Sequence, residues 1–404
     1  MPSRIISSPA RQPNEPVTIL SYGFRPFFLL AGVYGAFSLA AWLAAYAGWL
    51  VLSKTMAPVL WHGHEMLFGF AMAAATGFLL TAVPTWTKTS PERGGRLAFL
   101  VALWFAGRIA FWLQGVFPPP VVAMADLALI PAVIFFLIPP ILGSGQRRNF
   151  FFLVFLILFF AANLLFHLDF LEVTDDTGFT GLKLALYTFI LMMTVLSGRI
   201  IPSFTANALR IKNEDAEVRS EPLVEAAVFL AIIATAAADL AAAGGWLGGA
   251  PAVAAALALA LRMRYWRTAT TIDQPILWVL HLGHAWLVVG FACRGLAVLT
   301  DVIPASTALH ALTIGAIGTM VLAVTTRASL GHTGRPLVIH RSIVAAYVLV
   351  TLAAIVRLSA PLAEVEYYGN LVITAGLLWV AAFTIFSAVY WPILTGPRSD
   401  GLGG

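Results

Sequence analysis

The sequence is poor in cysteine and in charged residues. Cys293 is its one cysteine among 404 residues, which excludes a disulfide framework, a site of four thiolate ligands and a C-x-x-C-H attachment for c-type haem. Charged residues make up 11% of the chain and hydrophobic residues 60%, whereas soluble domains have about a quarter charged and about half apolar residues. The composition therefore excludes an ordinary soluble protein.

Several motifs that carry chemistry are also missing. The sequence has no phosphate-cradling P-loop, no nucleophile elbow and no Rossmann fingerprint, so an ATP-driven pump is not expected. The formal net charge of +5 would suggest nucleic-acid binding in a soluble protein. In a chain this apolar, basic residues usually set membrane topology instead, and we expect no nucleic-acid partner.

Long apolar runs fill most of the chain. A membrane-spanning helix needs about 20 apolar residues, and the pattern predicts an all-α, polytopic membrane protein with a bundle of about twelve helices. We expect one domain over 26–393, a cytoplasmic arm over 1–25 without a signal peptide, and a cytoplasmic tail over 394–404. The predicted spans are 26–52, 61–84, 97–116, 119–142, 149–169, 182–205, 222–243, 250–266, 275–299, 305–327, 340–360 and 367–393.

The basic residues favour one orientation in the bilayer. If the N-terminus is cytoplasmic, most arginines and lysines lie at the inner ends of the predicted spans, among them Lys88, Arg148 and Arg264. The outer ends carry mainly acidic residues such as Asp169 and Glu366. The positive-inside rule then places both termini in the cytoplasm.

Polar residues inside a membrane are costly and need a partner or a task. Arg108 and Asp126 lie nine residues before and nine residues after Phe117, which is at the tip of a predicted hairpin. They should meet at equal depth, and we expect an ion pair. Arg199 has no such mate, so it could bind an anionic cofactor group or extend to the lipid headgroups.

The eight histidines fall into two sets by depth. A single membrane histidine is more often a packing residue than a ligand, but four at one level on three helices suggest a cofactor site, because imidazole suits iron and copper. A three-imidazole copper site or a five-coordinate haem could use the outer set. The outer set is His62, His64, His167 and His310, and the inner set is His281, His284, His332 and His340.

The segment around His62 is the most informative. His62 and His64 would point about 200° apart on a regular helix, so they can share one metal only if the helix starts irregularly, which Gly63 permits. Glu65 lies one turn after His62, where it could relay protons or cap the helix N-terminus. The same face continues with small residues, Gly69, Ala73 and Gly77, and could accommodate a macrocycle or a closely packed helix.

Five segments between Ser21 and about Arg341 resemble the NnrS family, which comprises haem- and copper-containing bacterial inner-membrane proteins associated with nitric oxide metabolism. The resemblance implies twelve helices, non-covalent haem b and copper, and a place in the bacterial inner membrane. The adjacent His-His pair of haem–copper oxidases and nitric oxide reductases is absent. The matching segments are WHGHEMLFGF at 61–70, NLLFH at 163–167, GRIIPSFTAN at 198–207, HLGHAW at 281–286 and HALTIGAIGTMVLAVTTRASLGHTGR at 310–335.

The resemblance also supplies candidate ligands. His310 is the candidate for the haem axial position, and His284 and His340 are weaker candidates for any ligand role. Arg327 and Arg335 flank His332, and their guanidinium groups would suit haem propionates if they do not simply set topology. The candidate metal ligands are His62, His64, His167, His281, His310 and His332.

Three functions remain open on this basis. The first is an oxidoreductase that binds nitric oxide at a histidine-ligated metal and reduces it with electrons from quinol or another donor, with Glu65 delivering protons. The second is a non-catalytic haem protein that protects against nitrosative stress. The third is a secondary transporter, which we rank last because residues 26–205 and 222–393 show no convincing internal repeat.

Overall fold

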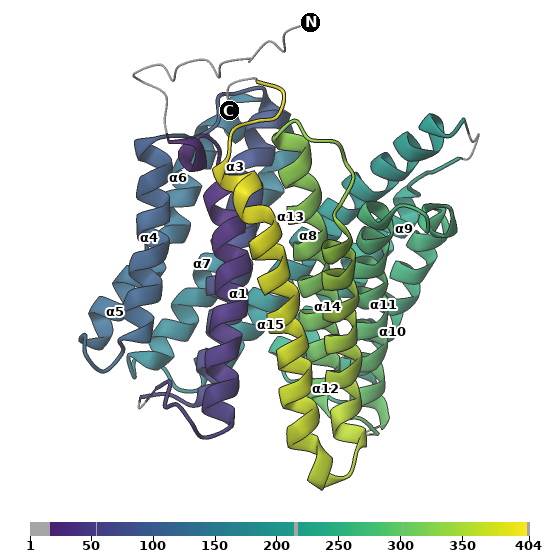
Figure 1. Ribbon diagram of the computed structural model, residues 1–404. Coiled ribbons are helices and arrows are strands. Elements are labelled where there is room, and N and C mark those ends of the chain that lie inside the picture. The colour runs from purple at the N-terminus through teal and green to yellow at the C-terminus, as the bar shows by residue number, and fades with distance from the viewer. Residues whose placement is uncertain (1–16, 54, 214–216, 301, 402–404) are drawn as a thin grey trace, which may run out of the picture.

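The computed structural model describes residues 17–53, 55–213, 217–300 and 302–401. Within that part the regular secondary structure is entirely helical, and twelve of the helices are long and apolar enough to cross a membrane (Figure 1). The prediction of an all-α, twelve-helix membrane protein is confirmed. Most of the predicted N-terminal arm, residues 1–16, lies outside the described residues.

The twelve spans follow one another through short connections, and the second, fourth and tenth spans are each divided into shorter helical elements. The 3₁₀ turns η1 (Thr18–Leu20), η3 (Arg147–Asn149), η4 (Thr268–Thr271) and η6 (Ala360–Leu362) lie in the connections or before the first span. The spans are α1 (Phe24–Tyr46), α2 (Pro58–His64) with η2 (Glu65–Ala71) and α3 (Met72–Thr87), α4 (Gly95–Trp112), α5 (Pro119–Leu127) with α6 (Leu129–Gly143), α7 (Phe150–Phe170), α8 (Thr177–Ile211), α9 (Pro222–Leu240), α10 (Gly245–Arg264), α11 (Pro275–Thr300), α12 (Ala305–His310) with η5 (Ala311–Gly318) and α13 (Thr319–His332), α14 (Arg341–Ser359), and α15 (Val365–Thr395).

Proline and glycine set several helix ends. Pro58, Pro119 and Pro222 each occupy the first turn of a helix, where the missing N–H costs nothing and the fixed φ suits the helix. α1 ends at Tyr46, six residues earlier than predicted, because Gly48 turns the chain with φ +80°. Hydropathy alone does not register such a turn.

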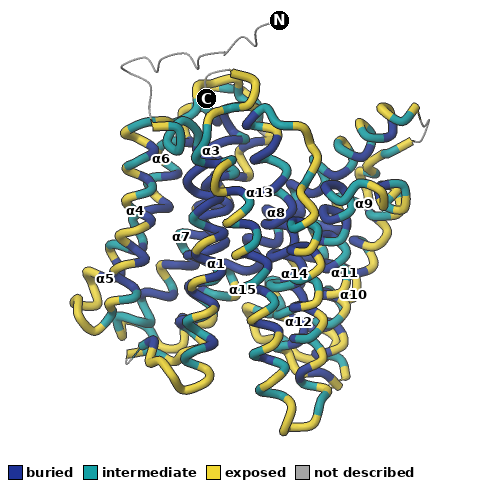
Figure 2. Tube along the Cα trace, viewed as in Figure 1, coloured by how far each residue is buried: buried dark blue, intermediate teal, exposed yellow. Residues whose placement is uncertain are grey.

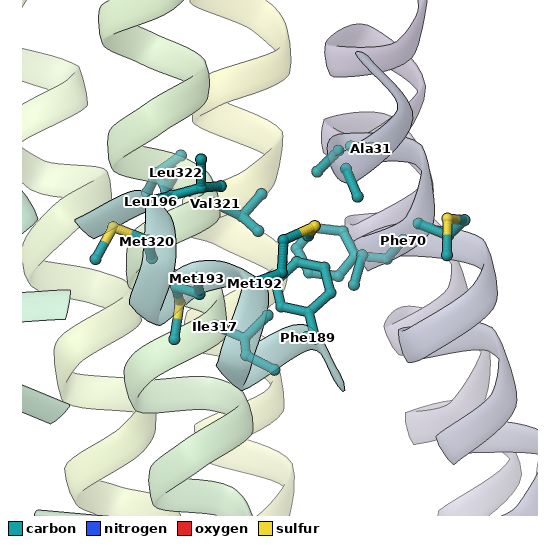
Figure 3. Packing of buried hydrophobic residues seen from close by; sticks show 14 of the residues in the cluster. Ala31, Phe70, Phe189, Met192, Met193, Leu196, Ile317, Met320, Val321 and Leu322 are labelled. Atoms are coloured by element: carbon teal, nitrogen blue, oxygen red, sulfur yellow. The ribbon is translucent and has the colours of Figure 1, made fainter. Parts of the chain in front are cut away.

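The second, sixth and tenth spans form the centre of the bundle. In the most apolar window of Pro58–Thr87, 89% of the residues are buried, against 22% for α9. Figure 2 shows the same gradient from buried central helices to exposed outer ones. In Figure 3, Phe70 of the second span, Met192 and Met193 of α8, and Met320 of the tenth span pack into one apolar core.

Two π-helical segments interrupt these central spans. η2 begins directly after His64 and η5 directly after His310. Each contains a glycine that lets a bulky ring approach the backbone: Tyr34 packs on Gly69, and Trp286 lies 2.6 Å from where a Cβ on Gly315 would be. π-helical turns are rare and frequently occur at functional sites, which directs attention to the two histidines.

The start of α1 and the end of α15 lie at the same end of the bundle (Figure 1). The Arg25 guanidinium joins them by donating to the carbonyl oxygens of Leu394 (2.9 Å) and Gly396 (2.7 Å). An even number of spans likewise places the two termini on the same side of a membrane. That both ends face the cytoplasm stays a prediction.

Candidate metal centre

A buried cluster of polar side chains lies between the second, third, fourth and fifth spans. Each member is at most 5% exposed. All lie roughly 5–10 Å along their helices from the same end of the bundle, at 1.5 Å per residue. The cluster, which we call the polar centre, consists of His64, Glu65, Arg108, Asp126, Asn163 and His167.

Arg108 is the cation of the polar centre. Its Nη2 donates to Asp126 Oδ1, so the ion pair predicted from the hairpin spacing is confirmed. Its Nη1 donates to Glu65 Oε1, a second partner that hairpin geometry does not predict because Glu65 belongs to a different span. One guanidinium therefore holds two carboxylates in place, and its fork suits such bidentate pairing.

The other oxygen of Asp126 faces two imidazoles. Asp126 Oδ2 lies 3.1 Å from His64 Nε2 and 2.8 Å from His167 Nε2, and it accepts a hydrogen bond from Asn163 Nδ2 at 2.8 Å. The potential ligand atoms of His64, Asp126 and His167 lie within 4.8 Å of one another. Three donors from three spans thus converge on one point.

The spacing of these donors suits a metal ion. Ligand atoms about 2.1 Å from a metal are about 3.0 Å apart at right angles and about 3.4 Å apart in a tetrahedron. The observed N···O separations of 3.1 and 2.8 Å match right-angle ligands. Without a metal, each of these contacts is a hydrogen bond only where that imidazole carries its proton on Nε2. Two imidazoles and one carboxylate form a donor set known for non-haem ferrous iron, and imidazole also suits copper.

Charge and outer contacts fit the same interpretation. With neutral imidazoles, Arg108, Glu65 and Asp126 give the polar centre a net charge of −1, which a bound cation would offset. His64 Nδ1 lies 3.0 Å from Glu65 Oε1, so a carboxylate can orient the imidazole from behind, as is common for metal ligands. His167 Nδ1 is buried and has no hydrogen-bond partner among the described residues.

A small pocket adjoins Arg108 and Asp126. Its volume is about 10 Å³, about what a single water molecule needs. Its walls combine apolar side chains with the polar groups of Arg108, Asp126 and Asn163, and only a water-sized molecule fits there. The apolar lining residues are Phe68, Met72, Leu103, Trp104, Leu129 and Ile130.

The four outer histidines do not share one site in the described structure. His62 and His64 lie on a regular helical turn, since the irregular segment begins only at Glu65. They therefore point apart: the His62 ring packs on Trp42 with ring centroids 4.5 Å apart, whereas His64 faces Asp126. The expected convergence of four is corrected: His64 and His167 come together with Asp126, and neither His62 nor His310 belongs to that cluster.

The inner histidines are divided among separate surroundings. The His281 ring nitrogens lie 3.0 Å from the hydroxyls of Thr205 and Thr268. His284 Nδ1 lies 3.3 Å from Ser197 Oγ, and its Nε2 is buried without a hydrogen-bond partner among the described residues.

The two histidines at the connection between the tenth and eleventh spans differ again. The ring of His332 lies 5.8 Å from that of Tyr22 and 5.5 Å from that of Phe24, measured between centroids. His340 is exposed and caps α14 by accepting from the Ser342 backbone N–H at 3.2 Å. A helix cap accounts for His340 fully.

The three candidate arginines lie outside the polar centre. Arg199 donates to the backbone carbonyl of Arg148 at 2.8 Å, so its polar partner lies in a connecting segment. The Arg327 guanidinium lies over the ring of Phe204, 3.8 Å from its centroid. Arg335 follows the end of α13. None of the three appears among the contacts of the polar centre.

Sequence reasoning did not identify Asp126 as a possible ligand or Asn163 as its anchor. A signal for Asn163 was present, because Asn163 and His167 are four residues apart and share one helix face. Asp126 was expected only as the partner of Arg108. Its second oxygen becomes a potential ligand because α5 packs beside α7.

The fold and the polar centre define a multi-pass helical membrane protein with a buried cluster suited to a metal ion. The family model described as NnrS protein matches residues 18–398, so the chain belongs to the NnrS family of haem- and copper-associated membrane proteins linked to nitric oxide. The search of curated proteins found no match.

Proposed function

We propose that this protein binds nitric oxide beside a copper or iron ion held by His64, Asp126 and His167, and reduces it to nitrous oxide. The observation that carries the proposal is the convergence of these three donors next to a small pocket of mixed polar and apolar lining. We place the protein in the bacterial inner membrane, with a non-covalent haem b elsewhere in the bundle.

The residues around the ligands have distinct tasks in this proposal. Arg108 binds Asp126 Oδ1 and Asn163 donates to Oδ2, so the carboxylate is fixed with Oδ2 toward His64 and His167. When bound, the metal would supply a site for the diatomic and a route for electrons. The pocket beside Asp126 has room only for a water-sized molecule, a size that a diatomic gas approximates.

Glu65 is suited to handle protons. Its Oε1 contacts His64 and Arg108, while Oε2 is buried with the Trp112 side chain nearby. Reduction of two nitric oxide molecules to nitrous oxide and water consumes two electrons and two protons. We assign Glu65 to hold and pass a proton at Oε2, with the electrons coming from quinol or another reduced carrier.

The test is nitric oxide consumption by the pure full chain with a reduced quinol analogue, combined with detection of nitrous oxide and assays of iron and copper. We expect turnover in the wild type and slower turnover with unchanged metal content in Glu65→Gln. His340→Ala, which alters an exposed cap, is the matched control. Stoichiometric uptake without nitrous oxide would replace the enzyme with a protective binding protein. A protein without either metal would leave the transporter hypothesis.

A further inference from the structure

One buried phenylalanine of α4 contacts three members of the polar centre. Phe111 is 0% exposed and lies three residues after Arg108, so the two side chains share one helix face. Its ring stacks on that of His64, with centroids 4.0 Å apart and planes inclined by 16°. The ring of His167 meets it edge to face at 6.3 Å, and the Arg108 guanidinium is 6.0 Å from its centroid. Phe111 therefore touches both imidazoles and the cation of the centre, although it has no ligand atom of its own.

The hydrogen bonds that hold the His64 ring change when a metal binds. Its Nδ1 faces Glu65 Oε1 at 3.0 Å, and its Nε2 lies 3.1 Å from Asp126 Oδ2 and 3.1 Å from Asn163 Oδ1. The latter two oxygens can accept only a proton on Nε2. An imidazole that coordinates through Nε2 uses its lone pair there, so its proton is on Nδ1 and is donated to Glu65. Metal binding therefore leaves the ring with a hydrogen bond on one side alone.

A single hydrogen bond does not fix the plane of a ring. The imidazole could still tilt about the line from Nδ1 to Glu65, because the torsion of a histidine ring about its Cβ–Cγ bond has a broad minimum. The Phe111 ring, parallel to the imidazole at 4.0 Å, blocks this tilt on its side, since rotation would drive the imidazole edge into the phenyl ring. Phe166 and Phe68 add tilted contacts at 4.5 and 5.0 Å. These aromatic contacts are the ones that do not depend on where the imidazole proton lies.

The imidazole of His167 is packed differently. The rings of Phe111, Phe166 and Phe170 all meet it edge to face, with interplanar angles of 86°, 86° and 74°. No aromatic ring stacks on its face within the part of the chain that the structure describes. His167 can therefore adjust to an ion, whereas His64 is held in one orientation.

We propose that Phe111 is a positioning residue for the metal centre. It holds the imidazole plane of His64 so that Nε2 stays directed at the point where Asp126 Oδ2 and His167 Nε2 converge. The same ring packs against the Arg108 guanidinium within cation–π distance, so one side chain braces a ligand and the cation that holds another ligand. The inference rests on the metal site of the proposed function and does not require that nitric oxide is reduced.

The experiment titrates the chelator-treated full chain in detergent with Co²⁺. Cobalt is the probe because its d–d absorption reports the geometry of its ligands. Phe111→Leu keeps an apolar side chain but removes the stacked ring. It should bind Co²⁺ about 10- to 100-fold more weakly than the wild type, as for other groups that orient metal ligands, and its d–d absorption should change. Phe111→Tyr retains the ring and should restore the affinity and the spectrum.

Phe159→Leu is the matched control for lost core packing. Phe159 is also 0% exposed, and the ring that it contacts among the described residues is Phe189, at 6.1 Å. This variant should lose thermal stability as Phe111→Leu does, yet keep the cobalt affinity and spectrum of the wild type. A single size-exclusion peak shows that each variant is folded. If Phe111→Leu does not fold, Phe111→Met fills more of the volume without a ring and carries the same expectation.

Three results would overturn the positioning role. The first is a folded Phe111→Leu variant with the cobalt affinity and spectrum of the wild type. The second is an equal loss of affinity in Phe159→Leu, and the third is a Phe111→Tyr variant as weak as Phe111→Leu, since each would show that the stacked ring is not what matters. A wild type that binds no Co²⁺ would refute the metal site and the positioning role together. Metal binding without nitric oxide turnover would refute the proposed reduction alone.

Discussion

Arg108 should be the most sensitive residue of the polar centre. Replacing it with methionine keeps much of the side-chain volume but removes the cation that pairs with both Glu65 and Asp126. The net charge of the metal-free centre then changes from −1 to −2. Two buried carboxylates are left without a counter-charge in the low-dielectric interior.

The size of the effect follows from how many charges are left unpaired. Removing one partner of a buried ion pair costs about 3–5 kcal/mol, and we expect Arg108→Met at the upper end because two carboxylates lose their partner. Asp126→Asn leaves Arg108 paired with Glu65 one to one and should cost only about 1–2 kcal/mol through weaker hydrogen bonds. The triple variant Arg108→Met, Glu65→Gln, Asp126→Asn has no charge to strand and should recover most of the loss.

The assay is equilibrium unfolding of chelator-treated protein in detergent. Removing metal first is necessary because a bound ion stabilises the folded state by mass action and would add its own effect to the comparison. Metal content, measured separately, should be lost in Asp126→Asn because the carboxylate ligand is gone. The reasoning fails if Arg108→Met and Asp126→Asn are equally stable, or if the triple variant is as unstable as Arg108→Met.

Three further outcomes are expected. His64→Ala and His167→Ala should each insert normally but purify with less non-haem metal by elemental analysis; full metal content in both would contradict the ligand assignment. Glu65→Gln should keep metal and slow nitric oxide consumption in an electrode assay, because the amide cannot accept a proton; an unchanged rate would remove Glu65 from the proton path. Gly69→Ala should lower thermal stability and metal content, because the added Cβ would collide with Tyr34 and lie 3.2 Å from Arg108 Nη1. The control Gly95→Ala, whose Cβ would have nothing within 4 Å, should match the wild type. Equal melting temperatures for the two variants would refute this reasoning.

The sequence by itself determined the number of spans and the depth of the polar residues. A membrane helix must satisfy its own backbone hydrogen bonds across a fixed hydrocarbon thickness, so hydropathy reveals it directly. Depth follows from counting residues along each span. The Arg108–Asp126 ion pair could be predicted because residues that are equally far from the tip of a short helical hairpin lie at equal depth in the membrane. The tip at Phe117 was visible in the sequence.

Only the tertiary structure decided which residues at one depth share a site. His62, His64, His167 and His310 were expected at the same level, yet packing brings only His64 and His167 together and turns His62 toward Trp42. The order of helices around the bundle, and the rotation of each about its own axis, depend on side-chain packing between segments far apart in the chain. Asp126 lies 62 residues from His64 and 41 residues from His167 in the sequence. Hydropathy does not tell which face each helix turns toward partners so far away along the chain.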